Sequence, residues 1–531
     1  MHFEFLQKSR DVTCSPDLLK SLGADRFLYL RGVEITDYLS ASVAVLEKRS
    51  RILRDTAEIP GLNALVDEWI TSLTYLSELV RKKNGQADGE RNLYSVKQLS
   101  LYFEIIDRAC AAYEEIRPAL TSDDYIALFD ALHSLADDEY RRFKRGTAQL
   151  LDDIAKIKSI SIGFNFDASL SPNEAGILSV NNRYIESGTL IDRLLRGDSR
   201  DSLCSVAPLV VTKRQITPDE FDVLEHALYT GVDKLFKKQL RQWEPEITAF
   251  LADKLGFLLE ILPDLRFISG LTELGLRMRE CGLPLCRPVF TDPAEKHFKG
   301  KGLYNPVLAM KFSENGRPMT DLVRNDLSFD DDGRLFLLTG PNNGGKSVFL
   351  SAVCLIQFMA QLGMMVPADA AEISPVTHIH VHFPKFRSLN EKGRLAEECE
   401  DIAAIFSGLD GAALVVMDEA FSSTDVRDAV TLSDTVLRAL AHTGVRGIFA
   451  THFHELSSYA DEINADNAGD RNASRIDFLV AGVAENETRT YRIVRRPPDG
   501  RSFAQTIAKK YGIVYEELIH STKERTKIND D

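Results

Sequence analysis

The sequence predicts an α/β fold from about residue 291 onward and a mainly α-helical fold before it. Apolar runs of strand length occur at 335–338 and 414–417, and each leads into residues suited to chemistry, a glycine-rich loop in one case and two acids in the other. Upstream, Leu39, Val43 and Leu46 recur at intervals of four and three residues, which is the spacing of a helix face.

The loop after the first apolar run has the spacing of a phosphate-binding loop, because Gly340, Gly345, Lys346 and Ser347 satisfy G-x-x-x-x-G-K-[ST]. Glycines let backbone N–H groups face phosphate oxygens, the lysine supplies a compact charge, and the serine hydroxyl can ligate Mg²⁺. A chance glycine-rich turn would lack the strand before it and the amphipathic helix expected after it, over 347–362. We therefore predict a nucleotide site formed by Gly340, Pro341, Asn342, Asn343, Gly344, Gly345, Lys346, Ser347 and Val348.

Two acids end the second apolar strand, Leu414 to Glu419. Asp418 is placed to hold Mg²⁺ together with Ser347, and Glu419 to polarise an attacking water. A third apolar strand, 447–450, leads to His452. Ligands bind at the carboxyl ends of strands in open α/β sheets, so we expect His452 to sense a γ-phosphate. The predicted catalytic residues are therefore Lys346, Glu419 and His452.

Composition narrows the class of protein. The chain has 64 Lys and Arg against 79 Asp and Glu, a net charge of −15, which argues against gripping nucleic acid by bulk charge but leaves room for a local basic surface. The seven cysteines are scattered and no charged-then-apolar leader opens the chain, so we expect a reducing cytoplasm. Cys281 and Cys286 lack a second pair at zinc spacing. No apolar run approaches the ~20 residues of a membrane span.

The sequence predicts that the first 290 residues are mainly helical and contain one β-hairpin. Helical patterns cover 35–117, 122–158 and 218–280, whereas alternation at 159–166, turn residues at 171–176 and an extended run at 177–180 predict a β-hairpin. The densest basic cluster is Arg141-Arg142-Phe143-Lys144-Arg145. An exposed helical turn balanced by the acids at 137–139 is favoured there over a contact with a phosphate backbone.

Taken together and in order, these motifs resemble the ATPase domain of the MutS family of DNA mismatch-repair proteins. The segments that carry the resemblance are 339–347, 366–368, 414–419, 422–424 and 450–456. It is specific over roughly 300–515 and weaker upstream, where helical content and the turn at 303–307 fit the family's core, lever and connector regions. It implies an ABC-like P-loop NTPase domain at 291–531, a core-like helical region at 1–120, and a lever- and connector-like region at 121–290 with the hairpin near 159–180.

The resemblance also implies an activity and partners. We expect Mg²⁺-dependent ATP hydrolysis that drives rearrangement of a homodimeric clamp on DNA. The chain begins at the helical core and ends shortly after Glu517, so we expect a short form without the mismatch-recognition domain or a Smr-type nuclease tail. Duplex or branched DNA would then be bound without mismatch specificity. The alternative is a nucleotide-gated scaffold that binds proteins and no DNA, a reading that the net charge of −15 supports.

One segment departs from the family pattern. Where mismatch-repair MutS proteins carry Ser-Thr-Phe, this chain reads Gly393-Arg394-Leu395, followed by Glu397-Glu398. In the family that segment reaches the nucleotide of the partner subunit, so the resemblance implies that Arg394 contacts phosphate in trans. The other reading is a surface arginine held by Glu397 and Glu398 and silent in catalysis.

Overall fold

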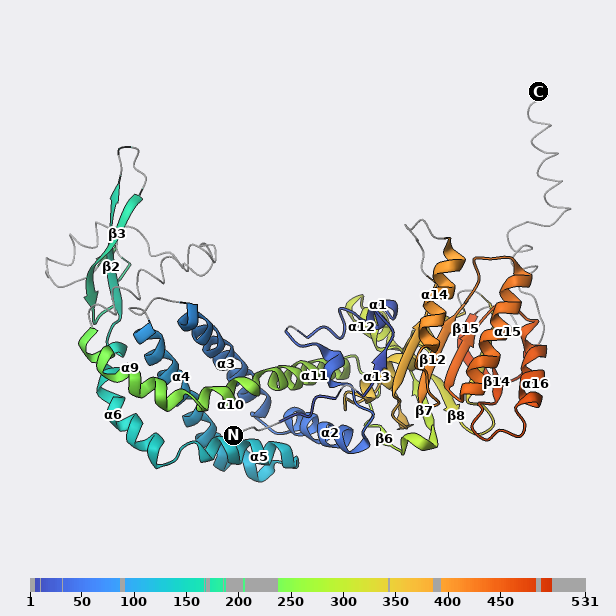
Figure 1. Ribbon diagram of the computed structural model, residues 1–531, viewed down its shortest axis with the longest axis horizontal. Helices are drawn as coiled ribbons and strands as arrows, with labels where there is room; N and C mark the ends of the chain where they lie inside the picture. Colours follow the sequence, from blue (N-terminus) through green and yellow to red (C-terminus); the bar gives the residue numbers. More distant parts are fainter. Residues whose placement is uncertain are drawn as a thin grey trace. The chain divides into compact units, whose positions relative to one another are not determined.

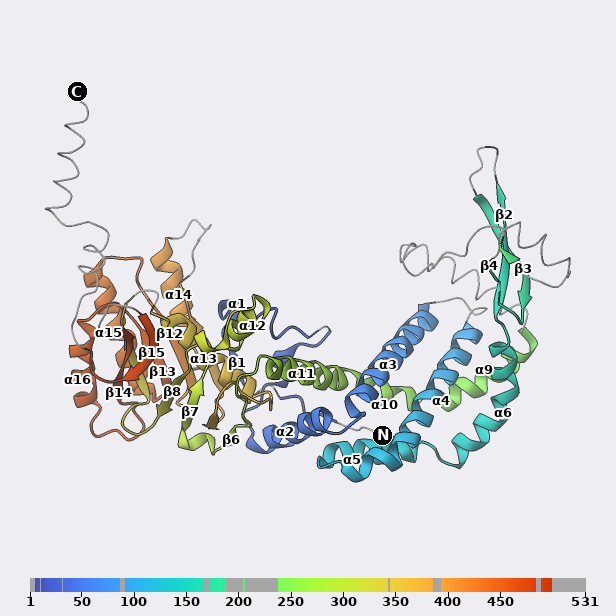
Figure 2. The same cartoon turned by 180° about the vertical axis from the view of Figure 1, so that it is seen from behind.

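The computed structural model describes residues 5–9, 11–30, 32–85, 91–166, 168, 172–184, 186–187, 204–205, 237–341, 344–384, 393–483 and 489–498. Contacts divide the chain into two units, one formed by 1–5 and 58–266 and the other by 6–57 and 267–531. Figure 1 and Figure 2 show the elements of both. The three-part division expected from the sequence stays a prediction.

The larger unit is built on a seven-stranded sheet with the order β1-β11-β12-β13-β9-β14-β15. Neighbouring strands are parallel except for the antiparallel pair β14 and β15. Every residue of β9, β12 and β13 is buried, which explains why the sequence shows them as continuous apolar runs. The strands are β1 (Thr13–Cys14), β9 (Leu335–Thr339), β11 (His378–His382), β12 (Ala413–Asp418), β13 (Arg446–Ala450), β14 (Ile476–Val483) and β15 (Arg489–Arg495).

Helices cover both faces of this sheet. On one face, Leu335, Val415 and Phe449 form a buried cluster with α14 (Arg394–Phe406), α15 (Val426–Thr443) and α16 (Leu456–Asp466). Because successive strand residues point to opposite faces, Phe336 and Val416 face the other side, where α13 (Lys346–Ala360) contacts β12. The helix expected at 347–362 is thus present with slightly shifted ends, and an α/β domain follows the helical region as predicted.

The amino-terminal segment supplies an edge strand to this sheet. Thr13 and Cys14 pair in parallel with His378 and Ile379 of β11. The next residue, Ser15, extends the junction by accepting a hydrogen bond from the Val381 backbone N–H at 3.0 Å. The sequence contains no signal for a strand this short.

A second, four-stranded sheet has the order β6-β10-β7-β8, with β7 antiparallel to both of its neighbours. Its strands are β6 (Val289–Phe290), β7 (Phe298–Leu303), β8 (Asn325–Phe329) and β10 (Ala370–Ile373). The remaining elements of the unit are α1 (Leu18–Ser21), η1 (Ile35–Tyr38), α2 (Val43–Glu58), η4 (Pro293–Glu295), α12 (Pro306–Glu314), η5 (Met319–Asp321) and most of α11 (Leu262–Glu280).

The other unit is mainly helical and contains the predicted hairpin, since β2 (Ser159–Phe166) and β3 (Pro172–Asn181) pair antiparallel. The expectation of a turn at 171–176 is wrong for residues 172–176, because they belong to β3, which pairs with β2. Ser122 and Asp137 cap two of its helices by accepting hydrogen bonds from Tyr125 and Tyr140 N–H. Of the expected helical stretch 218–280, residues 218–236 lie outside the described chain. The other elements are α3 (Leu62–Gly85), α4 (Arg91–Ile116), η2 (Arg117–Ala119), α5 (Asp123–Ser134), α6 (Asp138–Ala155), β4 (Glu186–Ser187), β5 (Cys204–Ser205), α9 (Lys237–Leu251) and α10 (Lys254–Glu260).

The basic cluster lies on α6 and is paired within the unit. Arg141 Nη2 donates to Asp138 Oδ1 at 2.7 Å, and Lys144 Nζ donates to Asp107 Oδ1 at 2.6 Å. Phe143 stacks on Phe250 with ring centroids 4.3 Å apart, so the cluster's aromatic residue belongs to the packing of the unit. These contacts favour an exposed, internally balanced helix surface. In the part of the chain that the structure describes, no helix is long and apolar enough to cross a membrane.

Candidate nucleotide-binding site

The predicted phosphate loop opens into a cleft of about 850 Å³, a volume typical of small-molecule sites. The loop follows β9, and the paired acids at the end of β12 line the same cleft. The lining residues are Ser21, Leu303, Tyr304, Asn305, Leu308, Phe312, Arg317, Asp321, Leu322, Val323, Asn325, Gly345, Lys346, Ser347, Val348, Phe349, Ala352, Phe383, Pro384, Asp418, Glu419 and Tyr491.

Two glycines shape the loop. Gly340 has a φ of 135°, and a Cβ there would lie 2.7 Å from the Cβ of Ala481, so both backbone and space require glycine. Gly345 has a φ of 91° and is the N-cap of α13, which places the start of that helix at the cleft. Pro341 and Gly344 lie between them, with the Gly344 N–H donating to the Pro341 carbonyl at 3.1 Å. The predicted residues Asn342 and Asn343 lie outside the described chain.

Lys346 is the buried cation of the cleft, with 5% of its surface exposed. Its Nζ donates to the Gly340 carbonyl at 2.8 Å and lies 3.7 Å from Glu419 Oε1. Burial lowers the pKa of the Lys346 ammonium, although Glu419 and Asp418 oppose that shift. A buried ammonium with a neutral carbonyl as its closest acceptor is a favourable site for a multiply charged anion.

Ser347 and Asp418 form the strongest sign of a cation site. Ser347 Oγ donates to Asp418 Oδ2 at 2.5 Å, while Asp418 Oδ1 is buried and has no hydrogen-bond partner in the part of the chain that the structure describes. Burial raises the pKa of the Asp418 carboxyl above its usual value. The described residues contain no group of three or more His, Cys, Asp or Glu side chains placed to hold a metal. A hydroxyl and one carboxylate nevertheless fit Mg²⁺, which takes few protein oxygens and completes its shell with phosphate and water.

Glu419 follows β12 in an unusual backbone conformation. Its φ is 46°, in the left-handed region that non-glycine residues seldom adopt, and Phe421 has a φ of 61°. The Glu419 N–H donates to the Ala450 carbonyl at 2.9 Å, which anchors the turn to the neighbouring strand β13. The side chain lines the cleft beside Lys346, so the structure brings the two predicted catalytic residues together.

Gly340, Pro341 and Gly344 of the predicted loop are not among the described residues that line the cleft, and neither are two predicted site residues outside the loop. His452 follows β13 and is exposed, whereas its neighbour Thr451 is buried and accepts a hydrogen bond from Phe453 N–H at 3.0 Å. Arg394 is exposed at the first position of α14. Neither His452 nor Arg394 is among the described residues that line the cleft.

The suggestion that Glu398 holds Arg394 is wrong. The Glu398 carboxylate Oε1 instead accepts hydrogen bonds from His382 Nε2 at 2.9 Å and from the Phe421 N–H at 2.7 Å. A helical glutamate four residues after an arginine is close enough to pair with it, but here the buried turn after β12 takes the carboxylate.

Most of the other lining residues are not predicted from the sequence, and Tyr491 and Asn305 are two of them. Tyr491 on β15 has a φ of 56°, and its Cδ1 lies 3.3 Å from where a Cβ on Gly345 would be. Asn305 caps α12 by accepting from Leu308 N–H at 3.0 Å, and its Nδ2 donates to the Val348 carbonyl at 3.3 Å. The Asn-Pro start of α12 is a recognisable capping signal, whereas nothing in the local sequence marks Tyr491.

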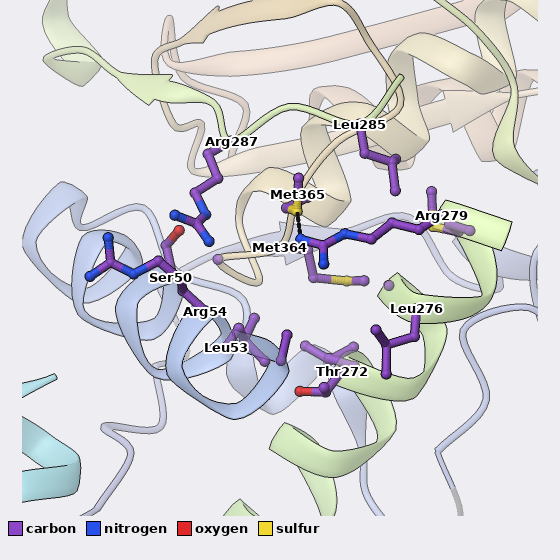
Figure 3. Close-up of a pocket in the computed structure, with 15 residues that line it drawn as sticks. Ser50, Leu53, Arg54, Thr272, Leu276, Arg279, Leu285, Arg287, Met364 and Met365 are labelled. Atoms are coloured by element: carbon purple, nitrogen blue, oxygen red, sulfur yellow. Dashed lines mark hydrogen bonds between the residues drawn. The ribbon is translucent and has the colours of Figure 1, made fainter. Parts of the chain in front are cut away.

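A second cavity lies between α2, α11 and the loop after α13 (Figure 3). Its volume of about 40 Å³ is room for only a few waters. In Figure 3 the Arg279 guanidinium reaches Met365, to whose sulfur it donates at 3.2 Å, and Leu53 and Leu276 help to form the walls. This cavity contains none of the phosphate-loop residues or paired acids, so the candidate nucleotide site is the larger cleft.

Comparisons with known proteins place the cleft within a segment that matches a family model. Residues 336–526 match the family model MutS domain V. The chain is 27% identical over 347 residues to "DNA mismatch repair protein MutS" of Prochlorococcus marinus, covering 62% of this chain and 36% of that protein. It is 29% identical over 331 residues to the protein of the same name from Thermotoga maritima, covering 60% and 39%.

A third relative carries a different name. "Endonuclease MutS2" of Thermus thermophilus is 32% identical over 200 residues, covering 37% of this chain and 25% of that protein. The chain thus matches about two fifths or less of the length of these curated relatives. The resemblance seen in the motifs is confirmed: the chain contains a MutS domain V at residues 336–526 and is similar to proteins named MutS over 62% and 60% of its length.

Proposed function

We propose that this chain is a Mg²⁺-dependent ATPase that binds ATP in the cleft after β9 and β12 and hydrolyses the bond between the β and γ phosphates. One observation carries the proposal. Lys346, Ser347 and Asp418 meet in one cleft, where a buried Asp418 oxygen has no hydrogen-bond partner among the described residues. Burying such an oxygen destabilises the fold unless a cation or a hydrogen-bond donor pairs with it.

Each residue has a role that follows from its surroundings. The Lys346 ammonium would exchange its carbonyl partner for phosphate oxygens, which are stronger acceptors. Ser347 and Asp418 would hold Mg²⁺, which neutralises phosphate charge when bound. Glu419 would orient the attacking water by accepting its hydrogen bond. His452 remains the proposed γ-phosphate sensor, a role for which its exposed side chain must turn toward the cleft.

Release of inorganic phosphate from ATP tests this function directly. The purified chain should turn over ATP with Mg²⁺, and EDTA should abolish turnover. A preparation that melts cooperatively and binds no ATP with Mg²⁺ present would reject the site assignment. ATP binding without turnover would limit the role of the cleft to that of a nucleotide switch.

We further propose that the partner is duplex or branched DNA and that the active unit is a homodimer whose rearrangement is driven by ATP. This proposal rests on the likeness to proteins named for DNA mismatch repair. The scaffold alternative is favoured by the net charge of −15 and by the internal pairing of Arg141 and Lys144 on α6.

A gel shift at several salt concentrations separates the two. Protein contacts to DNA phosphates release counterions, so affinity for DNA should fall steeply as salt rises. Matched, mismatched and branched duplexes should be compared at each salt concentration, with and without ATP. Absence of any shift at low salt with ATP and Mg²⁺ would favour the scaffold.

A further inference from the structure

The Glu398 carboxylate joins three segments of the larger unit. It projects from α14, and its Oε1 accepts from His382 Nε2 at the end of β11 and from the Phe421 N–H in the turn after β12. Its Oε2 lies 3.5 Å from Ser423 Oγ in the same turn. Burial alone would raise the pKa of this carboxyl, but the hydrogen bonds lower it, so Glu398 is a charged acceptor at neutral pH.

The turn that receives this carboxylate needs to be held in place. Glu419 and Phe421 both have left-handed backbone angles, with φ of 46° and 61°, and such conformations are unfavourable in non-glycine residues. Two hydrogen bonds bracket the segment. The Glu419 N–H donates to the Ala450 carbonyl, and two residues later the Phe421 N–H donates to Glu398.

We propose that Glu398 is a positioning residue for ATP hydrolysis, whose carboxylate holds the turn after β12 so that Glu419 points at the attacking water. The proposal rests on the proposed ATPase activity and adds a part to that same site. Glu398 lies outside the described lining of the cleft, so it acts through the backbone of Phe421 rather than on the nucleotide.

The contact between Glu398 and the turn after β12 can also transmit movement from the start of α14. Arg394 and Glu398 are four residues apart and share one face of α14. A displacement of the first turn of α14 is therefore passed by the Glu398 carboxylate to the backbone that carries Glu419. Contacts made at the start of this helix would in that way reach the catalytic acid without touching it.

The test compares Glu398→Ala with Glu398→Gln. Alanine removes the acceptor, and kcat should fall roughly 10- to 100-fold, the loss expected from misplacing a catalytic group by about 1 Å. KM and the affinity for ATP should stay within about twofold, because the phosphate loop is untouched. Glutamine keeps an oxygen that can accept from both the Phe421 N–H and His382 Nε2, and its NH2 group would face Ser423 Oγ, which can accept, so kcat should stay within about threefold of wild type.

Hydrogen exchange supplies a second readout that does not depend on activity. The Phe421 amide should exchange at least about tenfold faster in Glu398→Ala and remain protected in Glu398→Gln. Glu400→Ala is the matched control, because Glu400 is exposed on the same helix. Both its kcat and the Phe421 exchange should match those of wild type.

Several outcomes would overturn the proposal. A kcat for Glu398→Ala within twofold of wild type would mean that the turn holds without this carboxylate. Equal losses in the alanine and glutamine variants would show that charge matters rather than the hydrogen bond. A loss of ATP affinity that matches the loss of kcat would place Glu398 in nucleotide binding. If wild-type protein hydrolyses no ATP, the proposed function fails, while the amide exchange still reports whether Glu398 holds the turn.

Discussion

Ser347 Oγ donates a hydrogen bond of 2.5 Å to Asp418 Oδ2, and this bond joins the first turn of α13 to the end of β12. The two groups proposed to hold Mg²⁺ are therefore already adjacent to one another. A cation that enters between them replaces the hydroxyl proton as the positive partner of the carboxylate. The bond therefore fixes the distance between the first turn of α13 and the end of β12 before any ligand binds.

Ser347→Ala should raise the Mg²⁺ concentration needed for half-maximal turnover by at least about tenfold, because it removes one of two protein oxygens and leaves Asp418 unpaired. Ser347→Thr keeps the hydroxyl and should remain close to wild type. Phosphate release measured against Mg²⁺ concentration checks both variants. Identical Mg²⁺ curves for alanine and wild type would exclude Ser347 as a ligand.

Lys346→Ala should reduce ATP turnover more than about 100-fold and weaken ATP binding, because the loop loses its only motif cation. Lys296→Ala is a matched control. Lys296 also donates to a backbone carbonyl, that of Gly444 at 2.8 Å, and burial likewise lowers its pKa, but it does not line the cleft. Calorimetric titration of both variants with ATP measures the difference. Normal ATP affinity and normal turnover in Lys346→Ala would show that the cleft is not the ATP-binding site.

Glu419→Gln should bind ATP normally and hydrolyse it at least about 100-fold more slowly, because it loses the carboxylate that orients water but keeps Ser347 and Asp418. A single-turnover assay with prebound ATP measures the step itself. Rapid release of phosphate in that assay would mean that another acid activates the water.

Arg394 can be tested by mixing subunits. If its guanidinium reaches the nucleotide of a partner subunit, Arg394→Ala combined with Lys346→Ala should restore one working site, which pairs an intact loop with an intact arginine. Turnover of the mixture should then clearly exceed that of either variant alone. A mixture no more active than its components would leave Arg394 as a surface residue.

Arg495 on β15 stabilises the edge of the main sheet. Its guanidinium donates to both oxygens of Asp330, at 2.6 and 2.9 Å, and the pair lowers the pKa of the Asp330 carboxyl below 3.8. Because the folded pKa is depressed, this stabilisation is present above about pH 4 and is lost as pH falls through the lowered value. Arg495→Gln should cost about 1–2 kcal/mol in urea unfolding at pH 7, and progressively less as the pH falls below about 4. An equal cost at both pH values would show that packing, not charge, is responsible.

The sequence predicts structure best where all the residues that form a site lie in one short segment. The strand β9, the glycine-rich loop and the start of α13 follow one another, and each needs residue types that few other structures need. The same holds for β12 and its two acids. Tyr491 and Glu398 could not be foreseen, because their positions depend on contacts with residues far away in the chain. Sequence spacing predicts that Glu398 pairs with its helical neighbour Arg394, whereas in the structure its partners are His382 and Phe421.

The pairing of β1 with β11 has a consequence for how this protein is made. Ser15 and His380, which meet at that edge, are 365 residues apart. At about 5–20 residues per second, the amino-terminal segment leaves the ribosome roughly 20–70 s before its partner strand is synthesised. During translation that segment must stay unpaired or be shielded by a chaperone, and the nucleotide-binding sheet closes only when the two distant parts of the nascent chain meet.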